Sequence, residues 1–192
     1  LSFYSSHGGK AALEDHLTRI LWKQFQDFNF KAKGSGKSGL LSVSRCGQEI
    51  LERSACQISD AFITARFHVG FPAFGRTICA GELEKILFDF LPKCVEQSFF
   101  DCRLNKKAVE DTVFLAEYQE FIRNKLWEEG LTAFIANGSV LPRESGVSDK
   151  PMKGSVPFIS PKSMEKTFTL PHKGPITGMA VPQGITLIVG GG

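Results

Sequence analysis

Stretches of helical periodicity alternate with short runs typical of strands, and this alternation constrains the fold more than any other feature. Residues 10–28, 81–100 and 106–129 carry apolar side chains three and four positions apart, the spacing of one helix face. Pro92 must kink or split the second helix, because proline lacks an N–H and its ring clashes with the preceding turn. Strand patterns occupy residues 40–44, 58–69, 131–136, 139–141, 166–170, 176–181 and 185–189. The alternation predicts an α+β domain with helices on a mixed or antiparallel sheet.

Local signals also predict where several elements end. Asn105 is the expected N-cap of the third helix, and Gly130 is the expected residue just past its end. Asn137-Gly138 is a hairpin signal. Residues 142–161 are rich in proline, glycine and serine, which predicts a linker or a functional loop. Alternation within residues 58–69 predicts a core face and an opposite face that meets solvent or a ligand; the core set is Ile63, Ala65, Phe67 and Val69.

The composition is that of an ordinary globular chain. Of 192 residues, 42% are hydrophobic and 22% are charged. No run approaches the roughly 18 apolar residues of a membrane span, so we predict no membrane partner and exclude a collagen, a coiled coil and a disordered tail. The five cysteines are an odd number at spacings that match no zinc pattern. We therefore predict free thiols, no metal site and an intracellular, reducing compartment. No motif of a nucleophile or a metalloenzyme is present, so no catalytic residue is assigned.

Charge is unevenly distributed along the chain. Residues 1–40 hold six basic and three acidic residues, and residues 131–192 hold the same numbers, whereas residues 80–130 hold seven and eleven. The net charge of +3 is too small to prove a nucleic-acid partner. Two interpretations remain open: the acidic middle is a solvated helical face, or the two basic ends line one anion-binding surface.

A glycine-rich basic segment, Gly34-Ser35-Gly36-Lys37-Ser38, resembles half of the P-loop pattern G-x-x-x-x-G-K-[ST]. Lys31 stands where the first glycine should be, and the segment follows a helix and precedes a strand, the reverse of a P-loop. A true P-loop is therefore disfavoured, which leaves a flexible turn or an unspecific contact to a nucleic-acid backbone. The candidate phosphate contacts are Lys31, Lys33, Gly34, Ser35, Gly36, Lys37, Ser38, Arg66 and Arg143.

The last residues form a second phosphate-site signal. Residues 185–189 are a β-branched apolar run that leads into Gly190, Gly191 and Gly192. A buried parallel strand enters a phosphate-binding loop in this way. From spacing alone, a P-loop and a terminal strand with a glycine tail are equally favoured.

Longer segments give the chain a family resemblance. It resembles the ATPases of the ABC class, and the matching segments follow the family's order across nearly the whole chain. They are GSGKSGLLSV (34–43), GQEILER (47–53), GFPAFGR (70–76), GLTAFIANGSVLPRESGV (130–147), VPFISP (156–161) and GPITGMAVPQGITLIVGGG (174–192).

The resemblance implies that Gly190, Gly191 and Gly192 begin a Walker A loop that binds ATP or ADP with Mg²⁺. It also implies that the Walker A lysine, the Walker B acid and the ABC signature lie outside this chain, which would be a fragment without turnover of its own. The expected domains are an N-terminal α+β domain at 1–160 and the first strands of a P-loop ATPase domain at 161–192.

The resemblance raises RNA as a partner, because the family includes proteins of kinetoplastid mitochondrial RNA-editing complexes. A mitochondrial member would be expected in a kinetoplastid, and a cytoplasmic one elsewhere. A homodimer is an expectation from ABC-type ATPases, as is a larger ribonucleoprotein complex. Two functions follow: part of an ATPase that couples nucleotide state to RNA binding, or an RNA-binding module without its own catalysis.

Overall fold

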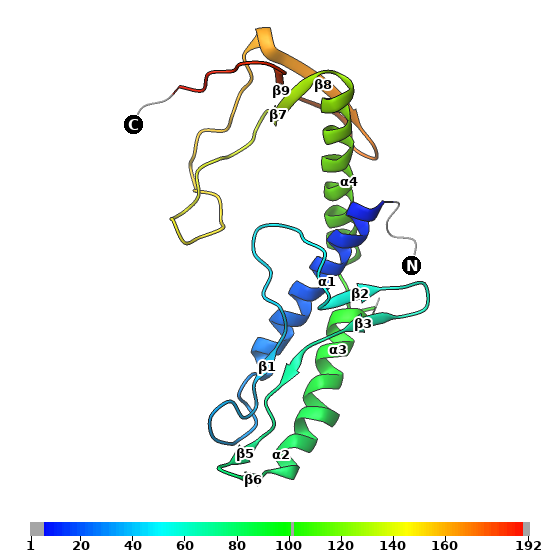
Figure 1. The fold of residues 1–192 in the computed structure, drawn as a ribbon, viewed down its shortest axis with the longest axis vertical. Helices are drawn as coiled ribbons and strands as arrows, with labels where there is room; N and C mark the ends of the chain where they lie inside the picture. The colour runs from blue at the N-terminus through cyan, green and yellow to red at the C-terminus, as the bar shows by residue number, and fades with distance from the viewer. Residues whose placement is uncertain (1–5, 101, 190–192) are drawn as a thin grey trace. The chain divides into compact units, whose positions relative to one another are not determined.

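The computed structural model describes residues 6–100 and 102–189. Figure 1 shows helices and short strands along the chain. The chain divides into two compact units, Leu1–Phe114 and Leu115–Gly192. The described elements are helices and small antiparallel sheets, which confirms the α+β class.

Helix α1 (His7–Phe28) is the centre of the first unit. Its N-cap is Ser6, whose hydroxyl accepts a hydrogen bond from the Gly9 N–H at 3.0 Å. Residues four apart on one face are buried and supply two core clusters. Leu21 and Phe25 belong to one cluster, and Leu13 and Leu17 belong to the other. One amphipathic stripe therefore organises both halves of the core.

The strands of the first unit form three antiparallel pairs. The pairs are β1 (Leu41–Ser42) with β4 (His68–Val69), β2 (Cys56–Ile58) with β3 (Ile63–Ala65), and β5 (Ala73–Phe74) with β6 (Thr77–Ile78). The expectation of one continuous strand over residues 58–69 is wrong. Ser59 and Phe62 close a turn through backbone and hydroxyl bonds, so the chain folds back on itself there. The predicted facing is correct, because Ile63, Ala65, Phe67 and Val69 pack against the core clusters.

Pro92 divides the second predicted helix as expected. The chain forms α2 (Ala80–Lys85), a π-helical turn at Ile86–Phe90 and α3 (Leu91–Phe99), with the proline in the first turn of α3. Proline is common in the first turn of a helix, and here that turn follows the π-helical turn without a break, because Phe90 and Leu91 both have right-handed helical backbone angles. In the π-helical turn the Leu91 N–H donates to the Ile86 carbonyl, five residues back.

Helix α4 (Lys106–Glu128) contains residues of both units. Asn105 caps it, since its side-chain oxygen accepts the Ala108 N–H at 3.2 Å. Gly130 has a φ of +63°, the left-handed conformation expected just past a helix end. Both predicted ends are confirmed.

A three-stranded antiparallel sheet forms the core of the second unit. Its strands are β7 (Leu131–Ala136), β8 (Glu165–Leu170) and β9 (Gly174–Pro182), in the order β7-β9-β8. The rings of Phe134 and Phe168 meet edge to face at 5.0 Å. A short 3-10 turn, η2 (Lys162–Met164), precedes β8.

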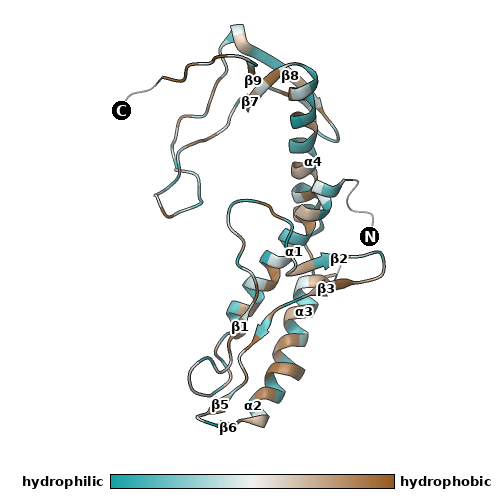
Figure 2. Cartoon of the chain, viewed as in Figure 1, coloured by the Kyte–Doolittle hydropathy of each residue, from teal (hydrophilic) through white to brown (hydrophobic). Residues whose placement is uncertain are grey.

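Two predicted strands are absent from the described part of the chain. Residues 139–141 form no strand, because β7 pairs with β9 and not with the segment after the Asn137-Gly138 turn. Residues 185–189 also form none, since β9 ends at Pro182 and no described segment pairs with them. Figure 2 shows this run as hydrophobic, and its apolar side chains are 80% to 106% exposed.

Between β7 and η2 the chain is irregular. One isolated bridge joins Arg143 to Pro151 within residues 142–161. The Asn137 side chain accepts the Ser160 N–H at 2.6 Å, which ties the end of this segment to the β7 turn. The domain boundary near residue 160 stays a prediction; the sheet that joins β7 to β8 and β9 lies on both sides of it.

Candidate nucleotide and nucleic-acid sites

The basic loop, residues 31–39, lies between α1 and β1. A Walker A loop requires the opposite order, a strand before the loop and a helix after it, so that helix N–H groups face the phosphates. The GSGKS segment therefore lacks the architecture of a P-loop. It is an ordered turn instead, in which the Phe30 N–H donates to the Gly39 carbonyl at 2.9 Å.

Two serines anchor the basic loop to the segment at residues 70–76. The Ser35 N–H donates to the Ala73 carbonyl at 2.8 Å, and the Gly75 N–H donates to the Ser35 hydroxyl at 3.3 Å. The buried Ser38 hydroxyl lies 2.6 Å from the Ser35 carbonyl and accepts the Ala73 N–H at 3.1 Å. Both hydroxyls thus hold two parts of the chain together that are about 35 residues apart.

Glycines allow this close approach. A Cβ at Gly34 would lie 2.4 Å from the Ser38 Cβ and 3.0 Å from the Ala73 nitrogen, and one at Gly70 would lie 1.9 Å from the Lys37 carbonyl oxygen. Gly36 meets nothing within 4 Å but has a φ of +62°, which favours glycine. Gly34 therefore has a packing role, and Gly36 a conformational one, that require no phosphate.

The lysines of the loop are exposed. Lys31 Nζ lies 4.8 Å from the centre of the Phe28 ring. The Lys33 N–H donates to Glu82 Oε2 at 2.9 Å, and the pKa of Glu82 is lowered, first by the hydrogen bond from Lys85 and then by that N–H. Within the described residues no carboxylate lies within 4.0 Å of Lys37 Nζ. The loop thus presents three ammonium groups on a backbone that hydrogen bonds to Ala73 and Gly75 hold in place.

The structure does not gather all the predicted contacts. Arg66 donates to the Ser54 carbonyl at 2.7 Å and to Gln57 Oε1 at 2.6 Å, so it lies against the start of β2. Arg143 is exposed and belongs to the second unit. Gly190, Gly191 and Gly192 lie outside the described residues.

A cationic pocket, which the sequence analysis does not single out, lies in the first unit. Its volume is about 300 Å³, and its lining residues are Arg19, Trp22, Lys23, Arg45 and Cys46. Three of the five come from α1 at positions i, i+3 and i+4, which places them on one helix face. This helical spacing is the one signal in the sequence that could have indicated the pocket. Arg45 and Cys46 join the pocket only through tertiary folding.

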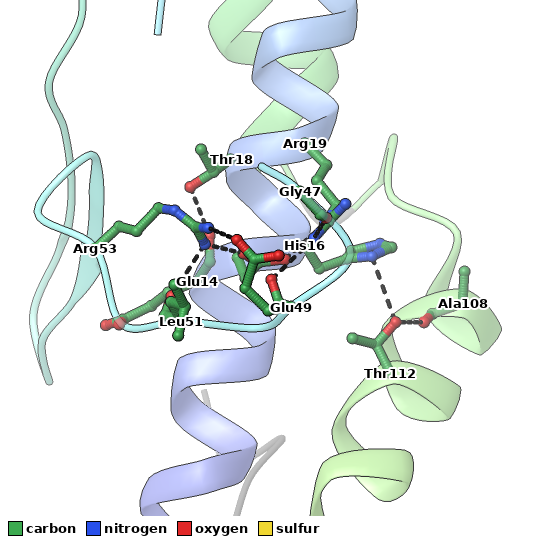
Figure 3. Close-up of polar contacts among 11 residues, drawn as sticks. Glu14, His16, Thr18, Arg19, Gly47, Glu49, Leu51, Arg53, Ala108 and Thr112 are labelled. Atoms are coloured by element: carbon green, nitrogen blue, oxygen red, sulfur yellow. Dashed lines mark hydrogen bonds and ion pairs between the residues drawn. The ribbon is translucent and has the colours of Figure 1, made fainter. Parts of the chain in front are cut away.

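Arg45 and Cys46 line the pocket opposite the α1 residues, and a buried carboxylate helps to hold their part of the chain against α1. Asp15 accepts from Arg19 Nε at 2.6 Å and from Arg53 Nη1. Arg19 also donates through Nη2 to the Gly47 carbonyl at 2.7 Å (Figure 3). These bonds join α1 to residues 47–53 and so fix the segment that carries Arg45 and Cys46.

The described residues contain no group of three or more His, Cys, Asp or Glu side chains that could hold a metal ion. None of the described helices combines the length and the hydropathy that crossing a bilayer requires.

Comparison with known families gives two adjacent matches. The N-terminal model of ATPases of the ABC class matches residues 2–102, and the ABC ATPase P-loop domain matches residues 105–192. No curated protein matches the chain. The N-terminal match alone covers more than half of the 192 residues. The chain therefore belongs to the ATPases of the ABC class.

Proposed function

We propose that this chain belongs to a protein that hydrolyses ATP and couples its nucleotide state to RNA binding. Family membership makes it an ATP-binding protein. The RNA part of the proposal depends on one observation: three exposed lysines project from a loop whose backbone is fixed by Ser35 and Ser38. A fixed loop backbone suits a polyanion, because little loop ordering is needed on binding.

For the nucleotide, we propose that the ATP phosphates bind main-chain N–H groups after Val189, at Gly190, Gly191 and Gly192. Glycine N–H groups in such a loop can surround phosphate oxygens without steric conflict. Mg²⁺ and the groups that act on the γ-phosphate would come from outside the 192 residues of this sequence.

For RNA, we propose that Lys31, Lys33 and Lys37 contact phosphates, with Arg66 and Arg143 as further contacts. Such contacts position a strand but do not read its sequence. We further propose that the protein forms a homodimer or part of a larger ribonucleoprotein complex. It would act in a reducing compartment, which is the mitochondrion in a kinetoplastid.

The test is RNA affinity measured against salt concentration. Replacing the three lysines with alanine should weaken binding to every sequence about equally. The salt slope should fall by roughly 0.7 for each lost single-strand contact, about 2 in total. A charge-matched control replaces Lys107, Arg123 and Lys153, which are exposed and outside the basic loop. If the loop variant keeps the parental slope, or changes it no more than the control does, the basic loop does not bind RNA.

A further inference from the structure

We propose that the cationic pocket of Arg19, Trp22, Lys23, Arg45 and Cys46 binds one nucleotide, a nucleobase together with its phosphate. The pocket shares no residue with the basic loop or with Gly190–Gly192. It is therefore a separate site, and it does not depend on the proposed function. The nucleotide is either a free mononucleotide or one unit of a single strand, and the two sources present the same chemistry to the pocket.

The aromatic part of the pocket is a stacking platform. The Arg45 guanidinium lies 5.5 Å from the centre of the Trp22 ring. A planar guanidinium over an indole leaves a flat, polarisable surface of the kind on which nucleobases stack in single-strand binding proteins. Trp22 packs against the core cluster that contains Leu21 and Phe25, so its ring is held in place.

The electrostatics of the pocket favour an anion. Its charged groups and their immediate counter-ions are Arg19, Lys23, Arg45 and Arg53 against Asp15 and Glu49, four positive and two negative, a net +2. Among the described residues, no carboxylate lies within 4.0 Å of Lys23 Nζ or of the Arg45 guanidinium. These two exposed cations are therefore available to a phosphate.

The pocket is preorganised. Asp15 and the Gly47 carbonyl hold Arg19 through Nε and Nη2, and no described hydrogen bond uses its Nη1. A guanidinium fixed in this way can offer its remaining N–H groups to a phosphate with little loss of side-chain entropy.

The size limits the ligand. A volume of about 300 Å³ is at the lower end of the range for small-molecule sites. It therefore suits one nucleotide rather than two.

Cys46 provides a reporter in the pocket wall. Burial, followed by the nearby Asp15, raises the pKa of its thiol, so the thiol is neutral near pH 7 and does not repel a phosphate. A bound nucleotide would cover the thiol and slow its alkylation. Cys102, which is exposed and outside the pocket, is the internal control.

The first measurement uses tryptophan fluorescence in a Trp127→Phe background, where Trp22 is the remaining indole. The ligands are adenosine and uridine monophosphates, a single-stranded RNA oligonucleotide, and an abasic strand of the same length. We expect base-bearing ligands to quench Trp22 and to protect Cys46 from alkylation relative to Cys102. Quenching by both mononucleotides and RNA supports a site for nucleotides of either source. Quenching by RNA alone supports a site for one nucleotide unit of a single strand. Equal effects from the abasic strand, or none from any ligand, overturn the proposal.

The second measurement compares Lys23→Ala/Arg45→Ala with Lys107→Ala/Arg123→Ala, which removes two exposed helical cations elsewhere. The pocket variant should lose about tenfold or more in affinity for the quenching ligand, as expected for a lost stack and phosphate contact. The control should lose clearly less. Equal losses would overturn the pocket without bearing on the basic loop, whose own readout is the salt slope of the lysine variant.

Discussion

The Asp15 carboxylate is a buried polar contact in the first unit whose removal should be costly. Its side chain is 2% exposed, and it accepts from both Arg19 and Arg53. Asp15→Ala would leave two guanidinium groups without their buried partner and would remove one of the contacts that hold residues 47–53 against α1.

The magnitude follows from how much water reaches the two arginines. Breaking a fully buried ion pair by removing one partner costs roughly 3–5 kcal/mol. Here the Arg19 and Arg53 side chains are 39% and 17% exposed. Hydration will offset part of the loss, so we expect a decrease in the free energy of unfolding of about 3 kcal/mol. With a urea m-value of about 2 kcal/mol/M, the midpoint should fall by roughly 1.5 M.

Urea unfolding followed by Trp22 fluorescence in the Trp127→Phe background measures this change for the first unit alone. The matched control is Asp89→Ala, which breaks an exposed pair with Lys93 on the same kind of helical spacing. It should cost about 0–1 kcal/mol. Asp15→Asn, which keeps one acceptor without the charge, should fall between the two. A loss for Asp15→Ala no larger than that for Asp89→Ala would refute the view that this carboxylate holds the pocket wall.

Gly34→Ala should destabilise the first unit by about 1–3 kcal/mol, because the new Cβ would meet Ser38. Gly36→Ala should cost only about 1 kcal/mol, because its positive φ disfavours alanine. Thermal melts that rank the two variants the other way would contradict the close packing of the basic loop at Gly34. Burial raises the pKa of the Cys56 and Cys94 thiols to about 12 and about 11, from an ordinary value of 9.0. The unfolded thiols therefore ionise first, and the free energy of unfolding should fall as pH rises above 9.0. This fall should be less steep in Cys56→Ala. If that substitution leaves the dependence of the unfolding free energy on pH unchanged, the Cys56 thiol is not buried as described. All five cysteines should be alkylatable after denaturation without reductant, which mass spectrometry can check.

Features that depend on neighbours along the chain follow directly from the amino-acid sequence. Helix α4 and strand β7 begin where their patterns predict. Asn105 stands at the start of the helix and Gly130 just past its end, because a cap needs only groups within the adjacent turn. The proline within residues 81–100 likewise predicts an interruption of the regular α-helix, and a π-helical turn lies directly before α3. The family assignment was also within reach, because whole segments of sequence carry it.

Pairing across the chain was decided by the tertiary structure. The same β-branched composition is compatible with one strand or with a hairpin, and Ser59 and Phe62 make it a hairpin. β7 pairs with β9, more than 40 positions away, and not with the adjacent residues 139–141. Strand composition indicates a half-buried surface but does not name the partner that covers it.

The two candidate sites differ in the same way. The lysines of the basic loop lie close enough together to be recognised in the sequence. The roles of Ser35 and Ser38, in contrast, depend on Ala73, which only folding brings near. In the pocket, Arg19, Trp22 and Lys23 share a helix face, whereas Arg45 comes from a separate segment that only folding brings to the indole. Helical periodicity fixes directions within one element, while a site assembled from two elements is set by the buried contacts that join them.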